Sequence, residues 1–224
     1  MFLIVDTETS GMPRFDCAAD DPRQPHIIQL GALLCEGPDL RIVSQLDHLI
    51  APKGFTEIEE GAYAVHGITF DKLVDEGVDM ALALASLDAM WEQATTYIGY
   101  SARFDLKLLR GARRRCGHPD RFDSLPVFEV MAAARPHAKA VDKNGKSKAP
   151  KLTEAVKALC GREHTAAHGA LDDCLATRDV VLALMQLGVQ PVGVAGVEAS
   201  KKGPTAKPVP TMVPMTASDE EGVF

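Results

Sequence analysis

The sequence has few cysteines, and none of them stand close together. Five cysteines are scattered over 224 residues, and no two of them form a Cys-x-x-Cys pair. An odd number in this arrangement argues against a disulfide scaffold and against a structural zinc site. The pattern is typical of a protein from a reducing compartment.

The chain also lacks a long apolar run. No stretch approaches the roughly 20 apolar residues that a membrane-spanning helix needs. The apolar start, residues 2–5, is too short for the core of a signal peptide and has no basic lead before it. We therefore expect a cytoplasmic protein without membrane contact.

An excess of basic residues is missing as well. The 24 Lys and Arg residues against 31 Asp and Glu residues give a formal net charge of -7. This balance argues against a generally basic nucleic-acid-binding protein, but it is compatible with an enzyme that binds nucleic acid locally and uses acids to hold metal ions. With 46% hydrophobic and 25% charged residues, the chain is typical of a soluble globular protein.

Apolar periodicity predicts one α/β domain over residues 1–188, a length that fits a single core. Three strands come first: one begins with the apolar run 2–5 and ends in Asp6 and Glu8, and those at 26–35 and 41–50 form a hairpin. A short strand is also predicted at 95–100, and a short strand or a helix start near 122–130. Helices are predicted after Thr56 and at 79–93, 101–115, 152–159 and 171–187. This order predicts a mixed five-stranded sheet that begins with three antiparallel strands and is flanked by helices.

Residues 189–224 differ in composition from the rest of the chain. Pro, Gly, Ala, Val, Ser and Lys dominate, periodicity is lost, and the last residues are acidic up to Phe224. Such a stretch buries too little apolar surface to offset its ordering entropy, so we predict a flexible tail. Its acidic end has two interpretations: a docking segment for a replication or repair protein, or a contribution to solubility alone.

The most informative local feature is a pair of carboxylates in the run Phe2-Leu3-Ile4-Val5-Asp6-Thr7-Glu8-Thr9-Ser10-Gly11. Side chains alternate across a strand, so Asp6 and Glu8 point to the same face. Two like charges about 6–7 Å apart raise each other's pKa unless a cation lies between them. A divalent metal ion would satisfy both groups. The alternative is that Asp6 caps a turn and Glu8 is solvated.

Two later segments supply further candidates. Asp105 lies one turn into the helix that follows strand 95–100, at an edge where α/β folds place functional groups. His168 stands at the start of the last helix, and Asp173 lies five residues later, inside it. The neighbouring Asp172 is the weaker candidate. The alternatives are a solvated helix face for Asp173 and a loop-to-helix cap for His168.

Four segments, taken in order, carry a resemblance to a known family. They are Asp6-Thr7-Glu8-Thr9-Ser10-Gly11, Val65-His66-Gly67-Ile68-Thr69, Ala102-Arg103-Phe104-Asp105 and His168-x4-Asp173. In this combination the chain resembles the DEDDh branch of the DEDD 3′–5′ exonucleases, the group of the proofreading epsilon subunit of bacterial DNA polymerase III. The tyrosine branch differs, because it has Tyr where this chain has Gly169. A longer loop over residues 12–25 is similar to that of phage and prophage exonucleases.

The resemblance implies a ribonuclease H-like fold and two Mg²⁺ or Mn²⁺ ions held by Asp6, Glu8, Asp105 and Asp173. Two metal ions about 3.5–4 Å apart stabilise both the attacking and the leaving oxygen of a phosphodiester. Hard oxygen ligands suit Mg²⁺ or Mn²⁺. His168 is the expected general base, because the pKa of histidine lies near neutrality.

The resemblance also implies substrate contacts. Val65 and His66 would line the pocket for the 3′-terminal nucleotide, although residues 65–69 alone also fit an ordinary turn with a buried valine. The first motif, with Thr7 and Thr9, would meet the terminal 3′-hydroxyl. The remaining candidates are at the start of the fourth predicted helix, Ser101, where the family often has Asn, and Phe104.

Two basic stretches are candidates for phosphate contacts, which give sequence-independent and salt-sensitive affinity. One is the lysine-rich loop before residue 151, represented by Lys143 and Lys146. The other is the arginine cluster, namely Arg110, Arg113, Arg114, Arg115 and Arg121. The alternative for the arginines is a solvated helix end that the helix dipole favours.

These observations predict a metal-dependent 3′–5′ exonuclease that releases nucleoside 5′-monophosphates from single-stranded or frayed DNA. The first alternative is an exoribonuclease similar to RNase T or oligoribonuclease, but the form of the first motif favours DNA. The second is a non-catalytic replication adaptor with the same fold. The intact set of four acids and a histidine argues against the adaptor.

Overall fold

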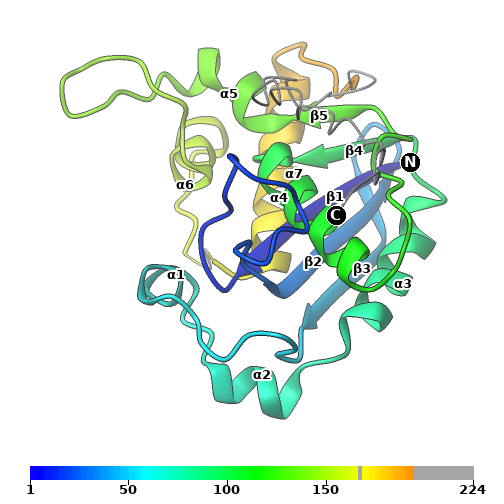
Figure 1. Cartoon of the computed structure of the whole chain (residues 1–224). Helices are drawn as coiled ribbons and strands as arrows, with labels where there is room; N and C mark the ends of the chain where they lie inside the picture. The colour runs from blue at the N-terminus through cyan, green and yellow to red at the C-terminus, as the bar shows by residue number, and fades with distance from the viewer. Residues whose placement is uncertain (166–167, 194–224) are drawn as a thin grey trace, which may run out of the picture.

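The computed structural model describes residues 1–165 and 168–193, and its strands form one sheet in the order β3-β2-β1-β4-β5 (Figure 1). The strands are β1 (Phe2–Thr9), β2 (Ile27–Glu36), β3 (Arg41–Leu49), β4 (Thr96–Gly99) and β5 (Val127–Glu129). The first three are antiparallel neighbours, whereas β4 runs parallel to β1 and β5 parallel to β4. The predicted fold class, α/β with a mixed five-stranded sheet that begins antiparallel, is confirmed.

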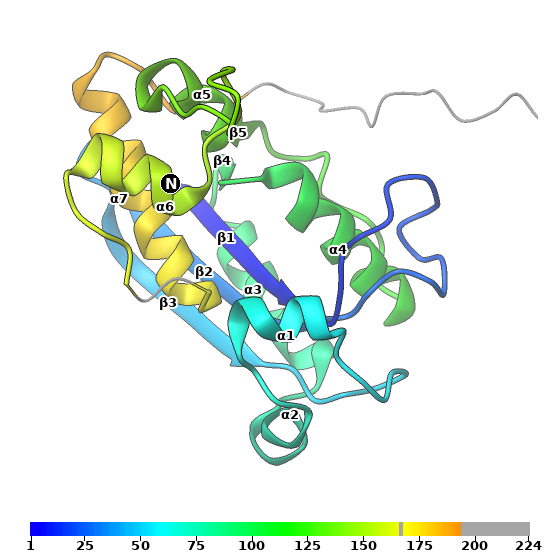
Figure 2. The ribbon, with the colours of Figure 1, turned by 90° about the vertical axis from the view of Figure 1, so that its left-hand side faces the viewer.

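Helices cover both faces of this sheet (Figure 2). They are α1 (Glu60–His66), α2 (Phe70–Glu76), α3 (Met80–Trp91), α4 (Ala102–Arg115), α5 (Val130–Ala138), α6 (Leu152–Ala155), the π-helix η1 (Val156–Cys160) and α7 (Ala170–Gln186). Alternation along β1 separates the two cores: Leu3 and Val5 pack with α3 and α4, whereas Ile4 packs with α5, η1 and α7. The end of β1 therefore lies between α4 and α7.

Two local predictions differ from the structure. The first strand contains both acids, as the sequence predicts, and continues to Thr9, because Asp6 and Glu8 stay paired with β2. The helix expected after Thr56 begins at Glu60, and α2 was not predicted, although Thr69 accepts a hydrogen bond from the Lys72 N–H at its start. Ser101 precedes α4 as expected, but its side chain makes no capping hydrogen bond.

The domain boundaries predicted at 188 and 189 lie at the edge of the described region. Gly188 follows α7 in the left-handed conformation, with φ of 85°, as the sequence predicts for a helix end. Residues 194–224 lie outside the described residues, so the flexible tail and its docking role stay predictions. In the part of the chain that the structure describes, every helix is too short or too polar to cross a bilayer.

A close approach between β2 and α7 fixes where the last helix begins. Gly31 lies opposite Asp6 in the sheet, and a Cβ on Gly31 would stand 2.4 Å from the carbonyl carbon of Ala170. Gln29 accepts a hydrogen bond from the Ala170 N–H at 3.2 Å and donates another to Asp47 at 2.8 Å. One glycine and one glutamine thus position the first turn of α7 beside the end of β1.

Replacing Gly31 with alanine should lower the free energy of unfolding by about 1–3 kcal/mol, because the added methyl group overlaps backbone atoms of α7. Urea denaturation of the full chain measures this change. Gly61→Ala is the matched control, since a Cβ at Gly61 meets no atom within 4 Å. A Gly31→Ala protein as stable as the wild type would contradict the close approach.

Candidate active site

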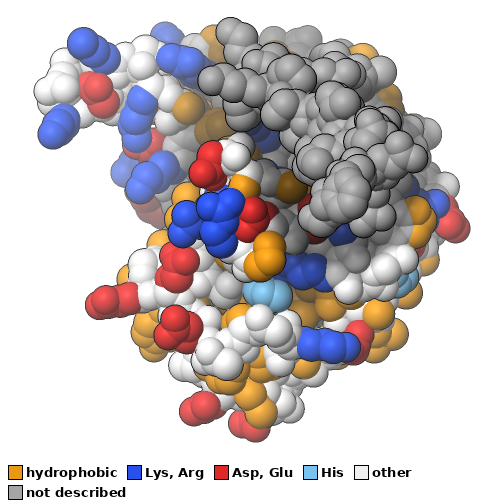
Figure 3. All heavy atoms as spheres, viewed as in Figure 1, with side chains coloured by type: hydrophobic (Ala, Val, Ile, Leu, Met, Phe, Trp, Pro, Cys, Tyr) orange, Lys and Arg blue, Asp and Glu red, His pale blue; other side chains and the backbone are white. Residues whose placement is uncertain are grey.

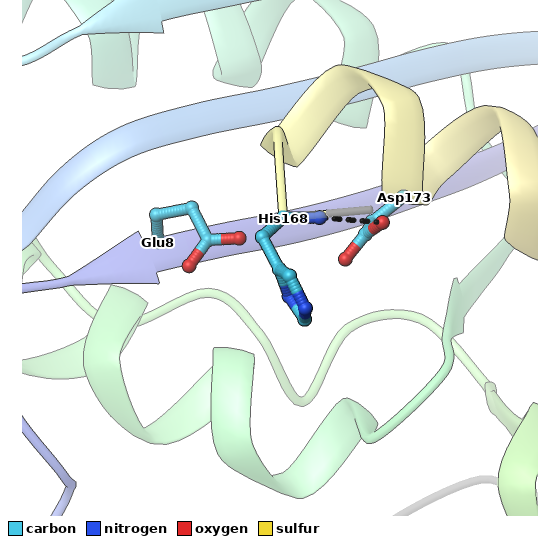
Figure 4. A group of neighbouring side chains, drawn as sticks. All are labelled: Glu8, His168 and Asp173. Atoms are coloured by element: carbon cyan, nitrogen blue, oxygen red, sulfur yellow. Dashed lines mark hydrogen bonds between the residues drawn. The ribbon is translucent and has the colours of Figure 1, made fainter. Parts of the chain in front are cut away.

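Four carboxylates from three elements meet at the end of β1. Asp6 and Glu8 come from the strand itself, Asp105 from the first turn of α4, and Asp173 from the first turn of α7. The ligand atoms of Glu8, Asp173 and His168 all lie within 4.8 Å of one another. Figure 4 shows these three side chains directed toward a common space. The structure therefore brings Glu8 and Asp173 together with His168, while Asp6 lies on the same face of β1 as Glu8 and Asp105 is bonded to Thr7 between them.

Asp105 reaches the site from the opposite face of the sheet. Thr7 alternates with Asp6 and Glu8 and so lies on the α4 side, where its hydroxyl donates a 2.8 Å hydrogen bond to Asp105 Oδ1. Both side chains are buried. Thr7 thus orients a carboxylate, and the substrate contact expected of it stays a prediction.

Burial, followed by the charges of neighbouring acids, raises the pKa values of Asp6, Glu8 and Asp105. Burial, followed by the charges of Asp173 and Asp105, raises the pKa of Glu8 from 4.5 to about 8. The pKa of Asp6 is raised by burial and then by the charges of Asp105, Asp173 and Glu8. Burial also raises the pKa of Asp105, against the hydrogen bond from Thr7. The site concentrates negative charge that the fold itself does not neutralise.

The donor set fits a divalent cation. Within residues 1–165 and 168–193, no lysine or arginine forms an ion pair with any of the four carboxylates. Their oxygens are hard ligands of the kind that Mg²⁺ and Mn²⁺ prefer. Asp172 is exposed, whereas Asp173 is among the clustered groups, which supports Asp173 as the fourth acid.

His168 lies at the open side of this cluster. Its residue is exposed, and its backbone N–H donates to Asp173 Oδ1 at 3.3 Å. The backbone of His168 has a φ of 76°, in the left-handed region that non-glycine residues rarely adopt. Such strain at a site is a cost of about 1–3 kcal/mol that the surrounding contacts must hold in place. The imidazole is thus available to a molecule bound against the acids.

His66 connects α1 to the end of β1. Its Nε2 lies 3.2 Å from the Thr9 carbonyl oxygen, and its Nδ1 accepts a 3.0 Å hydrogen bond from the Ile68 N–H. These partners assign the neutral Nε2–H form, in agreement with the burial that lowers the pKa of His66. Val65 is 51% exposed, which excludes the buried valine of the alternative interpretation. Its predicted contact with a nucleotide stays a prediction.

A pocket of about 450 Å³ opens next to this region, lined by His168, His66 and Ile68 and by residues of β3 and α2. Most of its lining groups are polar, including Lys72 and Asp47. The pocket therefore adjoins the carboxylate cluster on the side of His168.

The loop of residues 12–25 carries an exposed aromatic ring that the sequence alone did not single out. The Phe15 ring is 47% exposed and lies 4.9 Å from the Arg103 guanidinium carbon and 5.6 Å from Lys107 Nζ. Lys107 also donates a hydrogen bond to the Cys17 carbonyl oxygen at 2.5 Å. The side-chain amide of buried Gln24 donates hydrogen bonds to the carbonyl oxygens of Arg14 and Ala18. The loop is therefore docked on α4 through Arg103 and Lys107.

The two basic stretches have different surroundings. Each arginine of the cluster contacts an acidic side chain, a carbonyl or a histidine; Arg113, for example, is 2% exposed and bonds Asp88 at 2.6 Å. By contrast, Lys143 and Lys146 are exposed on a projecting turn that the Asp142 side chain holds through two backbone N–H groups. Blue side chains on this projection are visible in Figure 3. The lysines are the better placed group for phosphate contacts.

Two further groups near the acids were missed. Glu129 ends β5, and burial raises its pKa to about 7 against bonds from the Ala102 and Arg103 backbone. The apolar Val127 and Phe128 before it repeat the strand-then-acid pattern of Asp6, which could have identified it. His164 Nε2 lies 2.5 Å from Asp173 Oδ1. Nothing in the local sequence pattern points to that contact.

The raised pKa of Glu8 predicts how the metal-free protein responds to pH. The folded state keeps a proton on Glu8 that the unfolded state releases, so the free energy of unfolding should fall as pH rises from 4.5 to about 8. Thermal unfolding in the presence of a chelator measures this slope. Glu8→Gln should flatten it, and Glu57→Gln, at an exposed carboxylate, should not. A Glu8→Gln slope equal to that of the wild type would contradict the raised pKa.

Comparisons with known proteins agree with this arrangement. The sequence model of the RNase T family, described as Exonuclease, matches residues 3–181. Among curated proteins, no sequence match is found. E. coli Exonuclease I in complex with a dT13 oligonucleotide has 22% identity and a TM-score of 0.65 over 82% of this chain.

Two other solved structures are similar along nearly their whole length. Exonuclease X in complex with 5′ overhanging duplex DNA has 20% identity and a TM-score of 0.57, covering 87% of this chain and 98% of that one. The nuclease domain of 3′hExo, a DEDDh family member bound to rAMP, has 16% identity and a TM-score of 0.63, covering 84% and 92%. The chain spans only 40% of the length of Exonuclease I.

The family match covers most of the chain and includes the strand and helices that carry the four acids and His168. The structural matches show the same fold. The chain therefore belongs to the RNase T exonuclease family.

Proposed function

We propose that this protein is a metal-dependent 3′–5′ exonuclease that releases nucleoside 5′-monophosphates from single-stranded or frayed DNA. The observation that carries the proposal is the convergence of Asp6, Glu8, Asp105 and Asp173 beside the exposed His168, without a neutralising lysine or arginine among the described residues. This is the donor set that a two-metal phosphodiesterase requires.

The four acids would hold two Mg²⁺ or Mn²⁺ ions, whose charge activates a water molecule and stabilises the leaving oxygen when they are bound. The chain's own groups provide the remaining chemistry. His168 would take the proton of the attacking water, since its ring lies within reach of the clustered acids. Thr7 fixes the orientation of Asp105 through its 2.8 Å hydrogen bond.

The 3′ end of the bound DNA strand would lie between helices α1 and α4. Exposed Val65 and the pocket beside His66 and His168 provide space next to the acids for a terminal nucleotide. His66 is bonded to the Thr9 carbonyl, so α1 and β1 form one wall of that space. Ser101 and Phe104 stand at the start of α4, half-buried, on the same helix as Asp105.

DNA is the proposed substrate, and RNA is the alternative. Exonuclease I and Exonuclease X have been solved with DNA, and the 3′hExo nuclease domain with rAMP. These molecules support nucleic acid as the class of substrate. The non-catalytic adaptor is disfavoured because all four acids and the histidine are present, with the ligand atoms of Glu8, Asp173 and His168 within 4.8 Å of one another and Asp6 influenced by the charges of the other three acids. A replication or repair partner bound through residues 189–224, and a cytoplasmic location, stay predictions.

Two exposed groups, a pair of lysines and an aromatic ring, suggest the path of the DNA strand beyond the site. Lys143 and Lys146 project from the turn after α5 and would contact phosphates. Phe15, with Arg103 and Lys107 against its ring, would stack on an unpaired base, because every base has an apolar face. Stacking is tolerant of sequence, as a processive or trimming exonuclease requires.

Substitutions at the acids and at His168 test the activity. Loss of a residue that hydrogen-bonds to a metal ligand commonly costs about 10–100-fold in activity. Asp6→Ala removes a proposed ligand itself, so it should reduce the release of 3′-labelled nucleotide by more than that. His168→Ala should cost about 10²–10⁴-fold while metal binding is kept. The assay uses DNA and RNA oligonucleotides labelled at the 3′ end, with Mg²⁺ or Mn²⁺. His137→Ala, on α5, is the control. An Asp6→Ala protein with wild-type activity would refute the proposal.

Two variants separate the proposed contacts with the strand. Lys143→Glu with Lys146→Glu should weaken oligonucleotide binding and reduce the salt dependence of affinity by about 0.7 per lost contact. Phe15→Ala should weaken binding by about 1–3 kcal/mol without changing the salt dependence, because the ring carries no charge. Fluorescence anisotropy over a series of salt concentrations measures both. An unchanged salt slope in the double lysine variant would eliminate that path.

A further inference from the structure

His164 makes a buried contact with one of the four acids. Its Nε2 lies 2.5 Å from Asp173 Oδ1, and the His164 and Asp173 side chains are only 4% and 14% exposed. A carboxylate accepts hydrogen bonds, so the imidazole is the donor in this contact. A short, water-excluded bond of this kind fixes the orientation of both groups.

The same carboxylate oxygen holds a second group. Asp173 Oδ1 also accepts the backbone N–H of His168 at 3.3 Å, drawn as the dashed line in Figure 4. One oxygen therefore joins the His164 ring, the His168 backbone and the first turn of α7. The other oxygen of Asp173 makes no hydrogen bond with the described residues, and in Figure 4 it lies on the side of the His168 ring.

The segment that carries His164 is tied to α7 at a second place. It follows Gly161, which ends η1 in the left-handed conformation with φ of 68°. Arg162 in this segment forms an ion pair with Asp179, two turns further along α7. His164 and Arg162 thus attach the segment that precedes His168, between η1 and α7, to helix α7.

We propose that His164 is a positioning residue of the active site. By donating to Asp173 Oδ1, it leaves Oδ2 directed toward the site and holds in place the strained backbone of His168. The inference rests on the proposed function, because it assumes that Asp173 is a metal ligand. Residues behind a metal ligand commonly act in this way, and their loss reduces metal affinity or activity about 10–100-fold.

The test compares variants that keep or lose the donor. His164→Gln retains an N–H at a similar reach, whereas His164→Leu keeps much of the volume without a donor. His137→Leu, on α5, is the control for loss of a half-buried histidine. For each full-length variant, calorimetry measures the Mn²⁺ dissociation constant without substrate, and thermal unfolding with a chelator measures the stability of the metal-free chain.

We expect His164→Leu to raise the Mn²⁺ dissociation constant about 10–100-fold, and His164→Gln to stay within a few-fold of the wild type. Three results would overturn the inference. The first is wild-type Mn²⁺ affinity in His164→Leu, and the second is tighter Mn²⁺ binding in that variant, which would mean that His164 competes with the metal. The third is an equal loss of Mn²⁺ affinity in both His164 variants. If the wild-type chain binds Mn²⁺ and only the His164 result fails, the proposed function stands. If the wild-type chain binds no Mn²⁺, both fail.

Discussion

Burial of mutually repelling carboxylates at the end of β1 is the constraint on which the rest of the structure depends. Burial first, and then the charges of Asp173 and Asp105, raise the pKa of Glu8 from 4.5 to about 8, which corresponds to about 5 kcal/mol of unfavourable energy when that acid is ionised. Packing on both faces of β1 opposes this cost. Buried side chains contribute about 1.5–3 kcal/mol each, and α7 alone buries Val180, Val181 and Leu184 completely. The two cores therefore hold the acids together, and a bound cation would relieve the strain.

The acids come from opposite sides of one strand, and this explains the local design of the sequence. Thr7 faces α4 and holds Asp105, whereas Asp6 and Glu8 face α7 and Asp173. Gly31, which pairs with Asp6, has no side chain, and this allows the start of α7 to approach β2 closely. Period-two alternation in β1 thus supplies two of the four carboxylates directly and one orienting hydroxyl between them. A shift of the strand register by one residue would move the side chains of Asp6, Thr7 and Glu8 to the opposite faces of the sheet.

Much of this arrangement could be predicted because its signals are local or follow a family pattern. Asp6 and Glu8 after four apolar residues, and the spacing of His168 and Asp173, pointed to groups that the fold places near one another. The continuation of β1 to Thr9 was not predicted, because the strand stays paired with β2 through two acids, a residue type with low strand propensity. The bonds of Thr7 to Asp105 and of His164 to Asp173 were not predictable, since each depends on the side-chain geometry of the folded site. Arg113 similarly lies within a helix-end cluster in sequence but is buried against Asp88 in space.

The most direct measurement of the central claim is a crystal structure of the full chain grown with Mn²⁺ and analysed by anomalous scattering. The account predicts manganese peaks at the end of β1, with oxygens of Asp6, Glu8, Asp105 and Asp173 at about 2.0–2.3 Å, close to the distances of hard divalent cations. The absence of manganese from this position in crystals soaked at saturating Mn²⁺, or a lysine or arginine bound among the four acids in its place, would contradict it.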